Sequence, residues 1–243
     1  MARHWVGTSG WSYDHWKGPF YPEKLQRTDW LAHYAERLAS VEINASFYNL
    51  PRERVLAGWA ERTPPGFLFA VKAWRAITHH RRLANWGEAV ATFLGRLAAL
   101  GAKCGPVLFQ LPPRGRADPA RLAAFLDVLP EGRRYVFEFR DPSWHCDAIL
   151  ALLEARGAAF CPFELGALTA PRVATADFVY VRLHGREARY RGDYDDQALG
   201  DWAAWLKARK DEGRDVYVYF DNTDEADCAL GNAHRLCELL AAG

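Results

Sequence analysis

The stretch Tyr135–Trp144 (YVFEFRDPSW) decides how this chain is expected to fold. Side chains alternate along a β-strand, so its three aromatic residues share one face, whereas Glu138 and Arg140 lie on the other. A carboxylate or guanidinium is rarely buried unless it is paired or functional. Pro142 ends the strand. In a closed parallel barrel the charged face points inward near the C-terminal mouth, where the active sites of such barrels lie.

Seven further segments are rich in β-branched and aromatic residues, as strands are. The eight predicted strands are His4–Thr8, Ser40–Asn44, Phe67–Lys72, Val107–Leu111, Tyr135–Arg140, Ala159–Glu164, Phe178–His184 and Asp215–Asp221. Helical periodicity fills every gap except the sixth. The predicted helices are Trp30–Leu38, Arg52–Arg62, Gly87–Leu100, Pro119–Leu129, Asp147–Ala155, Gln197–Lys210 and Ala226–Leu240.

This alternation recurs at about 30 residues, the size of a βα unit with a right-handed crossover. Eight such units predict an α/β fold that is a single (β/α)8 TIM barrel over residues 1–243, with the sixth helix short or irregular. A doubly wound open sheet is the alternative. Its usual glycine-rich phosphate turn is missing, because the first strand is followed by Gly7-Thr8-Ser9-Gly10-Trp11 rather than G-x-G-x-x-G.

The composition is that of a globular protein with a large core, since half of the 243 residues are hydrophobic and a quarter are charged. The formal net charge of +1 gives no overall basic field for nucleic acid. Five cysteines without C-x-x-C spacing indicate reduced thiols, with no disulfide and no structural zinc. No signal-like or membrane-length apolar run is present, so a cytoplasmic protein without a membrane partner is expected.

Polar side chains gather on the predicted inner face near the strand ends. They are Glu42, Asn44, Lys72, Gln110, Glu138, Arg140, Arg182, His184 and Asp221. Barrel interiors are ordinarily filled by branched apolar side chains, so this pattern favours a functional site. The alternative is a mutually satisfied salt-bridge plug, but desolvation offsets most of the Coulomb gain of buried ion pairs.

Aromatic residues follow several strands at the same end, and faces with polar tips suit a ring-shaped polar ligand. Packing of the loops against the rim is the alternative for most of them. The predicted ligand contacts are Trp11, Tyr13, Asn44, Tyr48, Lys72, Gln110, Arg140, Trp144, Arg182, Tyr190, Asp221 and Asn222. The basic run 79–82 suits a phosphate or is a solvated turn. No H-x-H or H-E-x-x-H motif occurs, so neither a metal nor another cofactor is predicted.

Six segments in order resemble the YecE-like family of barrels, which is catalogued as a domain of unknown function. They are Val6–Tyr13, Val41–Tyr48, Phe69–Lys72, Leu108–Pro112, Val136–Arg140 and Tyr180–Gly185. The resemblance covers nearly the whole chain and implies a TIM-barrel fold, but no particular reaction; comparisons with barrel nucleases of the endonuclease IV type have been proposed. The chain departs from the family at Phe220-Asp221-Asn222, where the family usually reads Phe-Asn-Asn.

Three functions follow as alternatives. The first is a hydrolase-like enzyme acting on a polar, ring-containing small molecule, with Glu42 and Glu138 as general acid and base and His184 as a second proton-transfer group. From the strand order, the two glutamate carboxyls are expected roughly 6.5–9.5 Å apart, which leaves room for a water. The second is a nucleic-acid-binding or nuclease-like protein that uses the same mouth. The third is a non-catalytic barrel that binds a small polar or anionic ligand. The oligomeric state stays open.

Overall fold

The structure, a computed structural model, describes residues 2–80, 83, 86–224 and 228–242. It is an α/β fold of largely parallel strands wrapped by helices. The strands are β1 (His4–Thr8), β2 (Ser40–Ile43), β3 (Leu68–Lys72), β4 (Cys104–Leu111), β5 (Tyr135–Phe139), β6 (Ala159–Phe160), β7 (Phe163–Leu165), β8 (Leu168–Thr169), β9 (Phe178–Leu183) and β10 (Asp215–Phe220).

The α-helices occupy the positions that the periodicity predicted, with ends that differ by a few residues. They are α1 (Trp30–Ala35), α2 (Ala45–Tyr48), α3 (Glu53–Glu61), α4 (Gly87–Leu97), α5 (Pro119–Leu126), α6 (Asp147–Ala155), α7 (Asp196–Asp211) and α8 (Cys228–Ala241). The short α2 was not predicted. Residues 226 and 227 of the last predicted helix lie outside the described residues.

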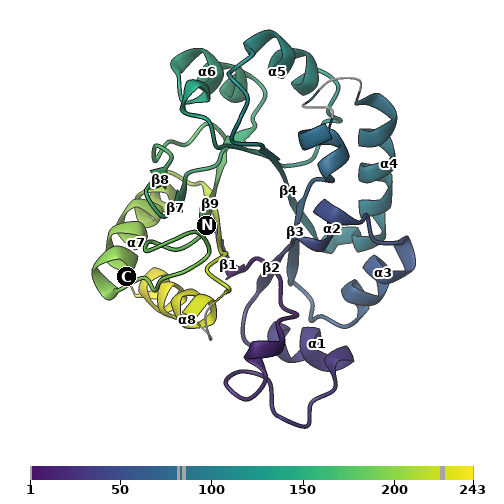
Figure 1. Cartoon of the computed structure of the whole chain (residues 1–243), viewed down its shortest axis with the longest axis vertical. Helices are drawn as coiled ribbons and strands as arrows, with labels where there is room; N and C mark the ends of the chain where they lie inside the picture. Colours follow the sequence, from purple (N-terminus) through teal and green to yellow (C-terminus); the bar gives the residue numbers. More distant parts are fainter. Residues whose placement is uncertain (1, 81–82, 84–85, 225–227, 243) are drawn as a thin grey trace.

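The strands form two five-stranded sheets, ordered β1-β10-β9-β7-β8 and β2-β3-β4-β5-β6. Every pairing is parallel except that of β7 with β8. Figure 1 shows both sheets around a common centre, with the larger helices outside them. All carboxyl ends of the parallel strands therefore lie at one end of the molecule.

The two sheets are also joined to each other. Just beyond β1, the Gly10 amide donates to the Glu42 carbonyl at 2.8 Å. On the other side the chain itself joins them, because it passes from β6 to β7 at Pro162, whose carbonyl accepts a hydrogen bond from the Arg182 amide of β9 at 3.1 Å within the β7–β9 ladder. Pro162 lacks an amide hydrogen and breaks the predicted strand Ala159–Glu164 into β6, which pairs with β5, and β7, which pairs with β9.

The sixth connection differs from the others. β7 turns directly into β8 through Gly166, whose φ of +57° suits a tight hairpin turn. Across residues 166–177, all of which the structure describes, there is no helix. The sequence predicted a short or irregular helix here, and the hairpin takes its place.

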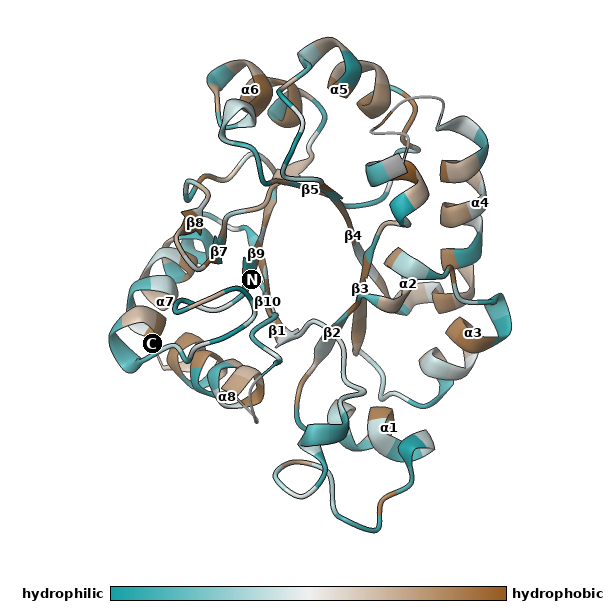
Figure 2. Cartoon of the chain, in the orientation of Figure 1, coloured by the Kyte–Doolittle hydropathy of each residue, from teal (hydrophilic) through white to brown (hydrophobic). Residues whose placement is uncertain are grey.

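Two hydrophobic cores lie on opposite faces of the strands, as the alternation predicted. Phe137 packs with the helices in the outer core, whereas its neighbour Val136 belongs to the inner core. The inner core consists of Trp5, Ala70, Leu108, Val136, Ala159, Cys161, Ala176, Phe178, Tyr180, Tyr217 and Tyr219. Hydrophobic helix faces are visible in Figure 2. Further toward the carboxyl ends, the same inner face becomes charged, at Glu138 and Arg182.

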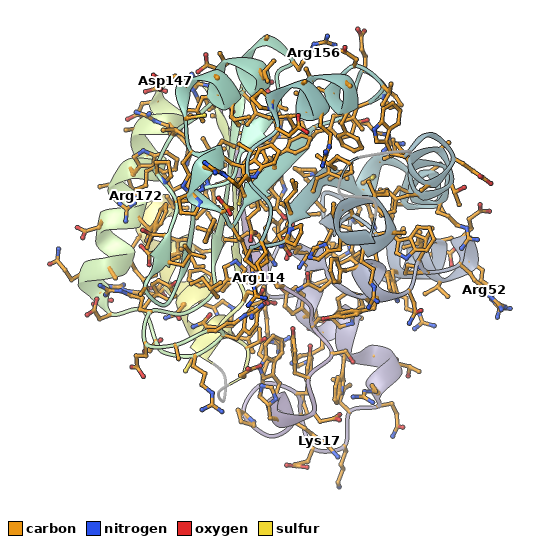
Figure 3. The ribbon with its side chains drawn as sticks, turned by 45° about the horizontal axis from the view of Figure 1, so that its top comes forward. Lys17, Arg52, Arg114, Asp147, Arg156 and Arg172 are labelled. Carbon is orange, nitrogen blue, oxygen red and sulfur yellow. The ribbon has the colours of Figure 1, made fainter. Side chains whose placement is uncertain are left out.

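The outer surface carries most of the charge, and Arg52, Arg156 and Arg172 project from it in Figure 3. All five cysteines are free thiols. Within the described part of the chain, no helix combines the length and apolar character needed to cross a membrane.

Candidate active site at the carboxyl ends of the strands

The guanidinium of Arg182 on β9 gathers three carboxylates. Its NH1 donates to Glu138 Oε2 at 2.7 Å, and its NH2 donates to Glu42 Oε1 at 2.7 Å and to Asp221 Oδ2 at 3.1 Å. These acids come from β5, from β2 and from the residue after β10. Burial acts to lower the pKa of Arg182, but the three carboxylates hold it well above its usual range. Arg182 is therefore permanently charged.

Glu138 is shared by two arginines. Arg140 Nε donates to its Oε1 at 2.6 Å, opposite the bond from Arg182. Burial opposes ionisation, yet the two guanidinium groups hold the pKa of Glu138 well below its usual range. With its pKa held this low by two guanidinium groups, the completely buried Glu138 is a fixed anion rather than a proton donor at neutral pH.

The carboxylate of Glu42 accepts further hydrogen bonds from two residues that were not predicted as site residues from the sequence. Ser9 Oγ donates to Glu42 Oε1 at 2.6 Å, and the Tyr180 hydroxyl donates to Oε2 at 2.6 Å. Tyr180 lies two residues before Arg182 on β9, so strand alternation was the available signal for it. Both glutamate carboxylates accept hydrogen bonds directly from the terminal nitrogens of the Arg182 guanidinium, so there is no room for a water between them and Arg182.

His184 and Asp221 form a second hydrogen-bonded pair. His184 Nδ1 lies 2.9 Å from Asp221 Oδ2. Because an ionised carboxylate only accepts hydrogen bonds, the ring hydrogen of His184 is assigned to Nδ1, which faces Asp221. Burial acts against ionisation of Asp221, but the bond from His184 and the charge of Arg182 lower its pKa below the usual value. The ring of Tyr190 covers His184 with centroids 5.8 Å apart.

Four polar side chains reach the opening above this network, and they are called the mouth residues: Lys72, Gln110, Arg140 and Asp221. Lys72 is 9 % exposed, Arg140 5 % and Asp221 7 %. Among the described residues, no hydrogen-bond or ion-pair partner meets Lys72 Nζ, Arg140 NH1 or Asp221 Oδ1. None of these atoms is fully buried, so each keeps some contact with solvent at this end of the strands.

The backbone around Lys72, the last residue of β3, is firmly held. Ser46 Oγ of α2 donates to the Lys72 carbonyl at 2.6 Å. The ring of Phe47, also on α2, covers the ammonium at 4.6 Å. Burial first, and then the charge of Arg182, lowers the pKa of Lys72 from 10.5 to about 8, against the opposing effect of the nearby carboxylates.

A cavity of about 420 Å³, called the side cavity, is lined in part by residues that follow β1 and β2, at the same end of the strands. Trp11 and Trp59 meet edge to face in it, with centroids 4.9 Å apart. Asn44 Oδ1, which also lines the cavity, is buried without a hydrogen-bond partner among the residues described. Other lining residues are Gly10, Ser12, Tyr13, Arg27, Thr28, Leu31, Ile43, Ala45 and Arg62.

Three of the predicted ligand contacts lie away from the mouth residues. Tyr48 is 65 % exposed on the surface of α2. Trp144 is buried and stacks on Phe139, which points toward the helices, at 4.7 Å. Asn222 is completely buried and donates to the side chain of Asn232 on α8 at 2.9 Å, so it fixes a loop. Their predicted contacts with a ligand stay predictions, and their packing gives each another role.

Half of the basic run 79–82 lies outside the described residues, because 81 and 82 are not among them. In the part of the chain that is described, no three His, Cys, Asp or Glu side chains form a group that could hold a metal ion. The reason is visible at the centre of the network, where Arg182 occupies the point at which Glu42, Glu138 and Asp221 converge.

Comparison with known proteins finds related sequences and structures. The chain is 28 % identical over 280 residues to UPF0759 protein YunF of Bacillus subtilis, covering 97 % of this chain and 94 % of that protein. It is 32 % identical over 141 residues to UPF0759 protein YecE of Escherichia coli, covering 58 % of this chain and 49 % of that protein.

The solved structure of a DUF72 family protein from Thermotoga maritima matches with a TM-score of 0.89 and 26 % identity, over 98 % of this chain and 99 % of the other. One from Enterococcus faecalis matches with a TM-score of 0.83 and 21 % identity, over 100 % and 96 %. The model of the family described as "protein of unknown function DUF72" matches residues 5–243, and the chain belongs to this family.

Proposed function

We propose that the two sheets close into one (β/α)8 TIM barrel and that residues 1–243 are a single domain. The hydrogen bond between Gly10 and Glu42 at one seam supports closure, as does the division of the sixth strand between β5 and β9 at the other. Gly7 supports it too, because a Cβ there would lie 2.0 Å from the Ser40 carbonyl oxygen of β2. Counting β6 and β7 as one strand, and leaving the antiparallel β8 outside the ring, gives eight strands.

We propose that the protein is an enzyme acting on a small, polar, anionic molecule that binds at the mouth residues. The observation that carries this proposal is that Lys72, Arg140 and Asp221 are nearly buried and yet each keeps an unpaired polar atom at the opening. A buried charge costs several kcal/mol unless it is paired, and among the described residues the ammonium of Lys72 has no ion-pair partner. A purely structural plug has no reason to leave two donors and one acceptor open on the same side.

The open atoms divide the work of binding and proton transfer. Lys72 Nζ and Arg140 NH1 suit an anionic group such as a carboxylate or phosphate. Asp221 Oδ1 suits a hydroxyl of the ligand, and His184 behind it forms the carboxylate–imidazole pair that enzymes use to move protons.

Glu42 and Glu138, for which the sequence suggested hydrolase-like acid–base chemistry, are better suited to a positioning role. Each of their carboxylate oxygens accepts a hydrogen bond within the network, and both side chains are completely buried. They orient Arg182 and balance its charge. Acid–base chemistry is therefore assigned to the pair at the opening rather than to the glutamates.

The side cavity supports a ring in the ligand. Its indole walls offer apolar faces, and the unpaired Asn44 Oδ1 offers an acceptor to a ring hydroxyl or amine. An unsatisfied buried acceptor costs about 1–3 kcal/mol, which a ligand donor removes. We therefore place the ring beside Trp11 and Trp59 and the anionic group at Lys72 and Arg140.

The proposal is tested by titration calorimetry with ring-containing anions (cyclic sugar acids, sugar phosphates and aromatic carboxylates) after a thermal-shift screen. We expect at least one to bind, with affinity lowered about tenfold or more by Lys72→Met or Arg140→Lys. Lys17→Met is the control, since Lys17 is exposed and forms only a surface ion pair. Equal binding to all variants contradicts the proposed site.

The same preparations separate the alternative functions. Conversion of the bound compound, followed by mass spectrometry, supports an enzyme, whereas binding of every hit without turnover supports a ligand-binding barrel. Tight DNA binding that weakens steeply with salt supports a nucleic-acid partner, because phosphate contacts release counterions.

A further inference from the structure

The amine of Lys72 differs from a structural lysine of the same chain. Lys103 Nζ is also partly buried, and it donates to the Ala60 carbonyl at 2.6 Å and to Thr63 Oγ1 at 3.0 Å. Lys72 Nζ has no such partner among the described residues, although it lies near three carboxylates. The hydrogen bonds of Lys103 thus hold two segments together, whereas the amine of Lys72 is left free to react.

The strand end that carries this amine is fixed by its surroundings. The carbonyl of Lys72 is held by Ser46, and the next amide, that of Ala73, donates to the Leu108 carbonyl of β4 at 2.8 Å. The Phe47 ring over the amine keeps solvent from one side of it. A reactive group held on a rigid strand end loses little entropy when it meets a ligand.

The electrostatic environment favours the neutral amine. Desolvation and a neighbouring cation are two established ways of activating a lysine, and Lys72 has both, in its burial and in Arg182. With its pKa lowered from 10.5 to about 8, the unprotonated fraction near neutral pH rises roughly 100-fold or more over that of an ordinary lysine.

We propose that Lys72 forms an imine with an aldehyde or ketone group of the substrate, so that the substrate is an anionic carbonyl compound. This inference rests on the proposed function and adds to it the reacting group. Arg140 then holds the carboxylate or phosphate of the same molecule, through the NH1 that faces the mouth.

The covalent step needs no oxidant and no further reactant. The lone pair of Lys72 Nζ adds to the carbonyl carbon, and one nitrogen-bound proton passes to the carbonyl oxygen, which gives a carbinolamine. The C–O bond then breaks, the oxygen takes a second proton from nitrogen and leaves as water, and a C=N bond remains. Asp221 Oδ1, open on the same side, accepts a hydrogen bond from the carbinolamine hydroxyl in this scheme.

Reductive trapping tests this inference on the intact protein. The wild type is incubated near neutral pH with glyoxylate or with pyruvate, which are an aldehyde acid and a ketone acid, and then with sodium cyanoborohydride. Hydride reduces the imine to a stable secondary amine, so the modified peptide gains the mass of the probe less one oxygen atom. Peptide mapping then compares the six lysines of the chain, Lys17, Lys24, Lys72, Lys103, Lys207 and Lys210.

We expect the adduct on Lys72 to form roughly tenfold or more faster than on any other lysine, because more of this amine is unprotonated. Urea-denatured protein is the control, and there the preference is lost. Lys72→Arg keeps the charge, and its mapping must show no residual fast site. An adduct spread evenly over the lysines of the folded wild type overturns the inference.

Failure of this inference and failure of the proposed function give different results. If the ring-containing anions still bind in a manner sensitive to Arg140→Lys while no fast adduct forms on Lys72, only the imine is wrong. If binding is also indifferent to Lys72→Met and Arg140→Lys, the proposed site itself is wrong.

Discussion

Arg182 NH1 lies 2.7 Å from Glu138 Oε2, and both side chains are completely buried. Neither charge is stable in the interior without the other, because the desolvation of each ion is repaid only by close pairing. The pair therefore forms the fixed centre on which the two further carboxylates and Arg140 are assembled. The mouth residues lie directly above it, so their positions depend on this centre.

The first prediction concerns Arg182→Met. Removal of the guanidinium leaves Glu42, Glu138 and Asp221 without their shared partner, and we expect the free energy of unfolding to fall by about 3–5 kcal/mol. Urea denaturation followed by circular dichroism measures it. The control is Arg156→Gln, which breaks a half-exposed pair with Asp127 and is expected to cost about 0–1 kcal/mol. If both variants lose a similarly small free energy of unfolding, Arg182 does not hold the three carboxylates together as described.

The second prediction is that Lys72→Met stabilises the protein. The pKa of Lys72 falls from 10.5 in the unfolded chain to about 8 in the fold, so the charged form near neutral pH is held at a cost. A difference of this size corresponds to roughly 3 kcal/mol, which is an upper estimate of the gain at pH 7. Urea unfolding of the variant and the wild type at pH 7 measures it, and a clear loss of stability argues against an unpaired ammonium.

The same pKa shift sets the pH dependence of wild-type stability. Between about pH 8 and pH 10.5 the unfolded chain binds more protons at Lys72 than the fold does, so the contribution of this residue to stability rises with pH through that window. We expect the difference in the free energy of unfolding between Lys72→Met and the wild type to shrink as the pH is raised from about 8 to about 10.5. A constant difference means that Lys72 titrates normally.

A third prediction concerns Asp221→Asn, which restores the residue that the family resemblance implies here. The amide keeps the shape but loses the charge that faces Arg182 and His184, so we expect a loss of about 1–2 kcal/mol at pH 7. Because the pKa of Asp221 is lowered in the fold, its contribution is present above about pH 4 and is lost as the pH falls further. The gap between variant and wild type should therefore narrow in acid, as urea unfolding at pH 7 and pH 3 can show.

The two tryptophans that the sequence assigned to the ligand are predicted to behave differently. Trp144→Ala removes a buried ring stacked on Phe139 and is expected to cost about 3–5 kcal/mol of stability without changing ligand affinity. Trp11→Ala is expected to lower the affinity for a ring-containing anion about tenfold with a smaller effect on folding. Calorimetry and urea unfolding of both variants measure these effects. If Trp144→Ala lowers the affinity and Trp11→Ala does not, the ring of the ligand binds at Trp144 instead.

Strand alternation explains why much of this architecture was predictable. Once Tyr135–Phe139 is a strand, the inward direction of Glu138 follows from its period of two, and the same argument places Glu42 and Arg182 on the inner face. Because all parallel strands end on one side, these charges had to meet there. The convergence at the strand ends was thus accessible from local pattern alone.

Distances across the interior were not accessible in this way. The sequence could not show that one guanidinium holds both glutamates, so it assigned them free roles as acid and base. It could not show that Trp59 on α3 reaches the side cavity, because a tryptophan on an amphipathic helix ordinarily belongs to the core. The break at Pro162 also required the pairing partners of β6 and β7.

The most direct test of the proposed site is a crystal structure of the wild type with the tightest-binding anion from the calorimetric panel. We expect the anionic group to lie about 3 Å from Arg140 NH1, with the ligand in contact with Lys72 Nζ and its ring against Trp11. A ligand bound at full occupancy elsewhere, with the mouth residues holding only solvent, would contradict it.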